Sequence, residues 1–169
     1  MTRSWISLFA LLALSGSAAA QERAEVGTIV DFVRVDKSNR TLTLYAQGRV
    51  VRTYSGIQLG DEPSGAKRFQ GDERTPEGRY TIDYGNPDSA YHLSLHISYP
   101  DRADRAHARS RGHSPGGDIF IHGQPNGYAK SPSDRVTGDW TDGCIALADA
   151  EIEEVWSLVG DGTAIEIAP

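Results

Sequence analysis

Apolar and polar residues alternate along most of this chain, with the two-residue period that is typical of half-buried β-strands. The segments with this pattern are also rich in Val, Ile, Thr and Tyr, which favour strands. They lie at residues 26–35, 40–56, 79–83, 91–99, 118–122 and 163–169. Polar stretches with Gly, Pro, Asn or Asp separate them, as expected for turns and loops. The pattern predicts a mostly β fold, a β-rich sandwich or barrel.

One segment near the end of the chain has a helical period instead. Its apolar residues recur at i, i+3, i+4 and i+7, as Ile152, Val155, Trp156 and Val159. We expect one or two short helices in the protein, including this one near residues 149–159. Asp149 is its expected N-cap, and Gly160 its expected end.

A basic segment follows the predicted strand at 91–99. Its positive or titratable residues are Arg102, Arg105, His107, Arg109, Arg111 and His113. We expect a solvent-exposed loop here, with recognition of carboxylates as the alternative use of the arginines.

The first twenty residues have the features of a cleaved secretory signal peptide. They contain one positive charge at Arg3, an apolar run, and a small-residue ending at residues 18–20. The apolar run is about half of the roughly 20 residues that a membrane-spanning helix needs. We therefore expect residues 1–20 to be removed, leaving 21–169 as a single domain in the periplasm without a membrane anchor.

The charge of the chain argues against a nucleic-acid partner. The formal net charge is −6 at pH 7, and removal of Arg3 with the signal peptide makes it −7. Binding to nucleic acid by neutralisation of phosphates needs a basic surface.

The chain contains a single cysteine, Cys144, in the stretch GDWTDGCIALAD. Exported proteins use cysteines in pairs, so an odd one indicates an intermolecular bond, a reactive thiol or a buried structural residue. A nucleophilic cysteine needs a base, and an imidazolium neighbour would lower its pKa. His122, followed by Gly123 at the end of the strand at 118–122, is the candidate base. Gly143 lets the backbone turn tightly before the thiol.

The residues around these positions resemble a known family. The stretches IFIHGQPNG and DWTDGCIAL, with GDERTPEGRY upstream, are similar to motifs of the L,D-transpeptidase (YkuD-type) catalytic domain of peptidoglycan enzymes. The usual form of that family has a His-Gly pair followed by Ser-x-Gly-Cys-Ile/Val-Arg. The resemblance covers roughly residues 26–167.

The resemblance implies a role for each matching residue. Cys144 is the nucleophile, and His122 is its base and later its acid. The carbonyl of Gly123 orients the imidazole, and the N–H groups of Gly143 and Cys144 form the oxyanion hole. A thioester would form with a peptidoglycan stem peptide at the bond between a diamino acid and D-alanine, with no metal or organic cofactor. An amine of another stem, a peptidoglycan-anchored lipoprotein or water would resolve it.

The chain departs from the family pattern at two positions. Ala146 stands where arginine is usual, which removes a possible clamp for a carboxylate. Asp142 stands where histidine is frequent, and its charge should oppose thiolate formation. The TDGCIA variant resembles a branch that includes murein hydrolases, so transfer and hydrolysis both stay open.

Four residues are candidates for contact with the substrate. They are Trp140, Thr141, Asp142 and His96. Trp140 could equally pack in the core. His96 lies on the polar face of the strand at 91–99, where it could simply be solvated.

Two alternatives belong to other classes. A zinc-dependent amidase could use His92 and His96, but on a strand these would lie about 13 Å apart, too far to share one ion. A non-catalytic cell-wall binding module, or a thiol redox sensor, is kept open by the loss of the usual arginine at position 146.

Overall fold

The computed structural model describes residues 30–169. The predicted signal peptide at 1–20 and the start of the first predicted strand, residues 26–29, lie outside the described residues. In the described part of the chain, neither helix is long and apolar enough to cross a lipid bilayer.

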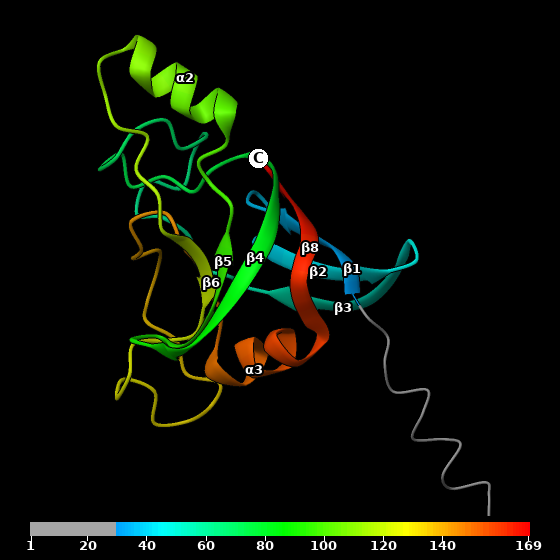
Figure 1. Ribbon diagram of the computed structural model, residues 1–169. Coiled ribbons are helices and arrows are strands. Elements are labelled where there is room, and N and C mark those ends of the chain that lie inside the picture. The colour runs from blue at the N-terminus through cyan, green and yellow to red at the C-terminus, as the bar shows by residue number, and fades with distance from the viewer. Residues whose placement is uncertain (1–29) are drawn as a thin grey trace, which may run out of the picture.

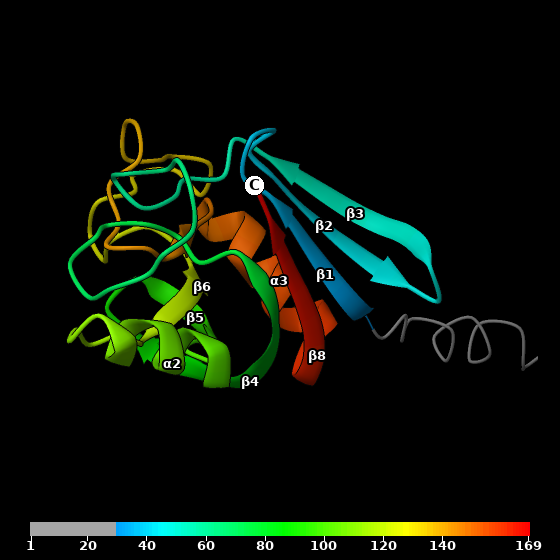
Figure 2. The same ribbon diagram turned by 90° about the horizontal axis from the view of Figure 1, so that it is seen from above.

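Within residues 30–169, eight strands form one curled sheet (Figures 1 and 2). The strands are β1 (Val30–Asp36), β2 (Thr41–Ala46), β3 (Arg49–Ser55), β4 (Gly78–Ser89), β5 (His92–Ile97), β6 (Ile119–His122), β7 (Ile145–Ala146) and β8 (Val159–Ala168). In space their order is β3-β2-β1-β8-β4-β5-β6-β7. The prediction of a mostly β protein with short helices is confirmed, and the sheet has the shape of a half-barrel.

The last strand of the chain, β8, lies in the middle of the sheet. It pairs in parallel with β1 and antiparallel with β4, so Ile165 lies opposite Val33 on one side and Tyr80 on the other. All three side chains are buried. The sheet therefore has one continuous core, in which the two halves of the chain meet at β8.

Helix α3 (Asp149–Leu158) packs against the sheet (Figure 2). Ile152 and Val155 are fully buried and Trp156 packs partly against the same core, as the helical period predicts. The helix ends at Leu158 and not at Gly160, because the chain passes directly into β8.

The N-cap of α3 is Ala148, which corrects the expectation for Asp149. The Asp149 carboxylate accepts a hydrogen bond from the backbone N–H of Gln124 instead, at 2.8 Å. The Glu151 carboxylate takes over the capping contact by accepting the N–H of Ala148, at 3.0 Å. Asp149 thus ties the start of the helix to the chain just after β6.

The basic segment expected to be a loop contains helix α2 (Arg102–Ser110). Asp101 and Asp104 form a capping box, because each carboxylate accepts the backbone N–H of the other residue. Only Ala108 of this helix is buried, so the apolar face that hydrophobic periodicity detects is missing. The four arginines of the segment are exposed, as expected, and α2 lies at the opposite end of the sheet from α3 (Figure 1).

Candidate active site

Parallel pairing of β6 with β7 brings the cysteine and the histidine to one place. Ile121 lies opposite Ile145 and His122 opposite Ala146, so Cys144, just before β7, lies beside β6. The side chains of both candidate catalytic residues line one cavity of about 530 Å³. The topology of the sheet thus brings together two residues that are 22 positions apart in the sequence.

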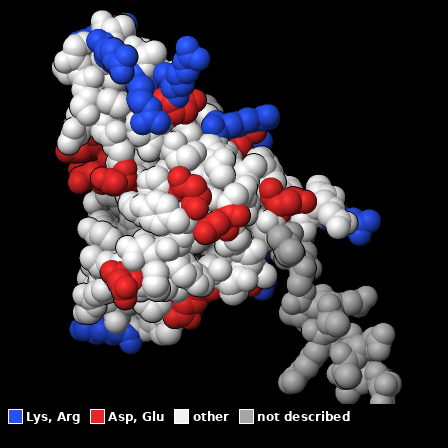
Figure 3. Space-filling view, in the orientation of Figure 1, with Lys and Arg blue, Asp and Glu red and all other residues white. Residues whose placement is uncertain are grey.

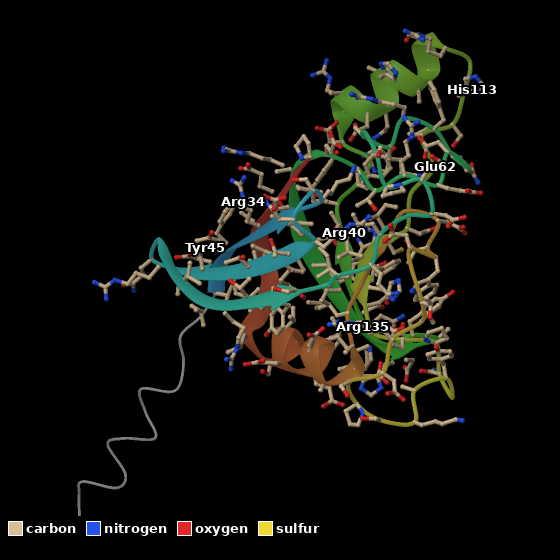
Figure 4. The ribbon with its side chains drawn as sticks, turned by 180° about the vertical axis from the view of Figure 1, so that it is seen from behind. Arg34, Arg40, Tyr45, Glu62, His113 and Arg135 are labelled. Atoms are coloured by element: carbon tan, nitrogen blue, oxygen red, sulfur yellow. The ribbon has the colours of Figure 1, made fainter. Side chains whose placement is uncertain are left out.

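The long segment between β6 and β7 is anchored at several points. Arg135 forms an ion pair with Glu151 of α3, and Arg40 pairs with Asp139; both arginines are labelled in Figure 4. The fully buried amide of Gln124 donates to the backbone carbonyl that follows β7, at 2.6 Å. These contacts fix the path of the backbone that carries the thiol.

His122 is buried and held in one tautomer. Its Nδ1 lies 2.7 Å from the carbonyl oxygen of Gly123, which can only accept, so Nδ1 carries the proton and Nε2 is left as the basic nitrogen. The ring packs against two aromatic side chains that also contact each other, with centroids 4.6 Å from Tyr91 and 5.6 Å from Trp140. Burial lowers the pKa of His122 to about 4, although the Gly123 carbonyl acts in the opposite direction. The imidazole is therefore neutral at pH 7.

The thiol of Cys144 contacts the backbone of the segment that leads into β6. The N–H of Phe120 donates to the sulfur at 3.4 Å, and the thiol can donate to the carbonyl oxygen of Asp118 at 3.6 Å. Among the hydrogen bonds of the described residues, none joins this sulfur to the imidazole of His122. The two groups share a cavity without being hydrogen-bonded in this state.

Burial raises the pKa of the Cys144 thiol to about 11. The N–H of Phe120 and the ammonium of Lys67 act to lower it, whereas the carboxylates of Asp142 and Asp118 raise it further. The expected opposition of Asp142 to thiolate formation is confirmed. The expectation of a thiol with a lowered pKa is wrong for this state, because the imidazole nearby is neutral and cannot stabilise a thiolate as an imidazolium would.

Two glycines of the motif are required by close backbone approach. A Cβ at Gly143, where φ is +131°, would lie 2.5 Å from the carbonyl oxygen of Arg74. A Cβ at Gly123 would lie 2.7 Å from a carboxylate oxygen of Asp149. Each glycine therefore lets a neighbouring segment pack against the motif, which no side chain at that position would allow.

The two amides expected to form an oxyanion hole differ in their availability. The N–H of Gly143 donates to the hydroxyl of Thr141 at 3.2 Å, and that hydroxyl donates to the carbonyl of Cys144 at 2.8 Å. Thr141 thus closes a tight turn around the cysteine, and its hydroxyl is used within the protein. No acceptor for the N–H of Cys144 is found among the described residues, so this amide is the free donor of the pair.

Three of the four residues expected to contact substrate line the cavity. They are Trp140, Thr141 and Asp142. His96 does not: its Nδ1 lies 2.6 Å from a carboxylate oxygen of Asp83, and its ring stacks on Tyr84. The structure therefore gives His96 a place on the sheet outside the cavity.

Several residues that were not expected at the site also line the cavity, and two of them, Tyr91 and Lys67, matter most for its chemistry. Tyr91 lies in the turn between β4 and β5, and its position against His122 depends on β5 pairing with β6. Lys67 belongs to the polar stretch 60–78, whose path over the site no local pattern predicts. Its side chain is only 4% exposed, and its Nζ lies 2.9 Å from Oδ1 of Asp72.

The two histidines considered as zinc ligands have separate partners. Nε2 of His92 lies 2.8 Å from a carboxylate oxygen of Glu153, whereas His96 pairs with Asp83. Within residues 30–169, no group of three or more His, Cys, Asp or Glu side chains is arranged to hold a metal ion.

The comparison with known families covers nearly all of the described chain. The L,D-transpeptidase catalytic domain, YkuD, matches residues 31–167. The chain belongs to this family. Within the L,D-transpeptidase domain, the His-Gly motif stands at the end of β6 and the Gly-Cys motif directly before β7, its parallel neighbour.

Individual relatives agree with this assignment. The chain is 29% identical over 134 residues to YafK of Escherichia coli (strain K12), a candidate L,D-transpeptidase, which covers 76% of this chain and 46% of YafK. A point mutant of the helical cell shape determining protein Pgp2 from Campylobacter jejuni has a TM-score of 0.65 at 25% identity, covering 85% of this chain and 52% of that one. Bd1075 from Bdellovibrio bacteriovorus shares the fold, with a TM-score of 0.57 at 22% identity over 83% of this chain and 51% of that one. The chain spans about half the length of these relatives.

Proposed function

We propose that this protein is a cysteine acyl enzyme of the L,D-transpeptidase type that acts on peptidoglycan stem peptides in the periplasm. Cys144 forms a thioester at the bond between a diamino acid and D-alanine. The family acts on peptidoglycan stem peptides. The observation that carries the proposal is the placement of Cys144 and the free Nε2 of His122 on one cavity, with Gly123 holding the imidazole in the basic tautomer.

The protonation states of the thiol and the imidazole define the first step. The thiol is protonated and the imidazole is neutral, so attack requires transfer of the thiol proton to Nε2 of His122. The carbon–sulfur bond forms as the proton moves, and the N–H of Cys144 donates to the developing oxyanion. The imidazolium then gives its proton to the departing amine of D-alanine, and the carbon–nitrogen bond breaks. The products are a thioester and free D-alanine.

The acceptor decides whether the protein is a transferase or a hydrolase. An amine of a second stem peptide, or of a peptidoglycan-anchored lipoprotein, would give a new amide by attack on the thioester, with His122 accepting its proton. Water would give a shortened stem. We assign the chain to the branch of the family with the TDGCIA motif, which includes hydrolases. Hydrolysis is the second candidate because Ala146, in place of the usual arginine, is fully buried and contributes no charge to the cavity.

Incubation of the protein with purified sacculi, followed by separation of the muropeptides, tests this proposal. We expect new crosslinks if the acceptor is an amine, or shortened stems if it is water, and neither from Cys144→Ala. Because the chain has one cysteine, a carbapenem adduct is expected at Cys144 and should be seen by intact mass. Equal activity of Cys144→Ala, or activity that only a chelator abolishes, would contradict the thioester and favour the metal amidase. Binding to sacculi without any change in the muropeptides would favour a binding module.

A further inference from the structure

Lys67 places a buried positive charge beside the candidate catalytic cavity. Its side chain is 4% exposed, yet it is one of the residues that line the cavity together with Cys144. Among the described residues that line the cavity, Lys67 is the only lysine or arginine. A buried ammonium is costly unless it is paired, so its partners decide what it can do.

The partners of Lys67 leave part of its ammonium available. Nζ lies 2.9 Å from Oδ1 of Asp72 and 3.4 Å from the backbone carbonyl oxygen of Asp142. An ammonium has three N–H donors, and these contacts use two of them. No acceptor for the third is found among the described residues.

Asp72 is held by the backbone and does not depend on Lys67 alone. Its carboxylate also accepts the N–H groups of Arg68, Phe69 and Arg74, at 2.6, 2.9 and 3.2 Å. These backbone donors and Lys67 hold the pKa of Asp72 below its ordinary value, against its burial. The carboxylate thus keeps Lys67 in place, while its oxygens are already shared among four donors.

We propose that Lys67 binds a carboxylate of the acyl donor. The proposal rests on the function proposed above and names the residue that recognises the donor's charge. The stem peptide offers this group in two places, at the terminal D-alanine and on the side chain of a diamino acid that carries its own carboxyl group. Lys67 supplies from a different part of the chain the charge that Ala146 lacks.

The rest of the cavity indicates that the ligand also carries a positive charge. Glu73, Asp118 and Asp142 line the cavity and are exposed to solvent, whereas Lys67 is buried beside them. A ligand with only negative charges would meet these carboxylates unfavourably. A diamino acid with a free amine and a free carboxylate matches both parts, with the carboxylate at Lys67 and the ammonium toward the exposed acids.

Binding to proteins that carry Cys144→Ala tests the proposal without turnover. The probe is a synthetic tetrapeptide stem that ends in the diamino acid and D-alanine. It is prepared with both carboxylates free, with the terminal one amidated, and with the side-chain one amidated. Titration calorimetry compares Cys144→Ala alone with the same protein carrying Lys67→Met, Lys67→Arg, or Lys67→Met with Asp72→Asn. The last variant removes both charges and carries the comparison if Lys67→Met alone does not fold.

We expect Cys144→Ala to bind one amidated peptide more weakly than the free peptide, by about tenfold or more, the size of a lost charge-assisted hydrogen bond. The amidated peptide whose affinity falls identifies the carboxylate that Lys67 binds. Lys67→Met should bind all three forms alike, and Lys67→Arg should keep part of the preference. The proposal is overturned if Cys144→Ala binds the three forms equally, or if Lys67→Met keeps the preference of its parent. If Lys67→Met loses the same factor of affinity for all three peptides, as a purely structural role of Lys67 predicts, the proposal is also overturned.

The failures of the two proposals are distinguishable. Thioester formation by the unmodified protein is measured separately, by intact mass with the free peptide. A preference for carboxylate without any thioester would contradict the proposed reaction and leave Lys67 as a ligand-binding residue. A thioester that forms equally well from all three peptides would support the proposed reaction and contradict the proposed role of Lys67.

Discussion

At the level of single residues, both Cys144 and His122 are neutral near pH 7. The pKa of the thiol is about 11 and that of the imidazole is about 4, so the proton stays on sulfur near neutral pH. Both shifts have the same main cause, because burial disfavours the charged form of each group. Proton transfer must therefore accompany attack on the substrate.

The first prediction concerns the reactivity of this thiol. At pH 7 the folded protein should react with iodoacetamide roughly twentyfold more slowly than the urea-unfolded chain, because the small thiolate fraction outweighs the higher nucleophilicity of each thiolate. The rate should keep rising between pH 9 and pH 11. The unfolded chain is the matched control, since Cys144 is its only cysteine. A plateau with a midpoint below pH 8 would contradict the raised pKa.

The second prediction concerns His122 and acid stability. Its folded pKa of about 4 lies below the unfolded value of about 6.5, so below pH 6.5 the unfolded chain binds a proton that the folded chain does not. The free energy of unfolding should fall as the pH drops from 6.5 to 4 and level off below that. Between pH 7.5 and pH 4.5 the unmodified protein should lose about 2 kcal/mol more than His122→Gln.

Urea unfolding at the two pH values measures this difference. The other titratable groups are common to both proteins and cancel in the comparison. Equal losses in the two proteins would mean that His122 titrates normally and is not buried as described.

The residues of the site differ in how far the sequence could predict them. Cys144, His122 and their glycines stand in recognisable motifs, and the structure places them together. Lys67 and Tyr91 lie in a loop and a turn with no such motif, so their positions depend on tertiary packing. The pKa of the thiol could not be predicted either, because burial, its main cause, is a property of the assembled cavity.

At the level of elements, hydrophobic periodicity predicted what the core buries. Most strands and α3 place apolar side chains against that core, and their patterns indicated their types, whereas β3 buries only Tyr54 and the two-residue strand β7 was too short for a pattern to predict. Helix α2 buries only Ala108, so periodicity could not detect it. Asp101 and Asp104 form its capping box, but Asp in place of Glu or Gln at the third helical position, with no apolar run after it, is a weak sequence signal. The range of α3 was predicted to within one residue, but its N-cap was not, because Asp149 instead accepts the N–H of the distant Gln124 and Glu151 makes the capping contact.

The third prediction tests the contact between α3 and β4. A Cβ on Gly85 would lie 2.6 Å from ring carbon Cη2 of Trp156, so Gly85→Ala must push the helix or the indole away. We expect a loss of about 1–3 kcal/mol in the free energy of unfolding. Gly160→Ala is the control, because nothing lies within 4 Å of a Cβ there, and it should change stability by less than about 0.5 kcal/mol. Chemical denaturation of both variants measures the difference, and equal stabilities would contradict this close packing.

At the level of the whole molecule, charged residues are unevenly distributed over the surface, while buried side chains join the strands of the sheet. The chain is acidic overall, yet lysines and arginines gather at the α2 end of the molecule, while acidic residues lie over the rest of the face shown (Figure 3). The sheet itself is continuous through β8, which lies between β1 and β4 and joins them through buried side chains.

The last prediction is that the sheet unfolds as one unit. Ile165 is 1% exposed and lies between Val33 and Tyr80, so Ile165→Ala should cost about 2–5 kcal/mol through lost burial and the cavity left behind. If β8 couples the two halves, native-state hydrogen exchange should show the same loss of protection in the slowest amides of β2 and of β5. Glu166→Gln, on the other face of β8, removes exposed ion pairs and should cost less than about 1 kcal/mol. A loss confined to β1–β3, with β5 and β6 unchanged, would mean that the half of the sheet holding Cys144 and His122 is stable without the other, and that β8 does not couple them.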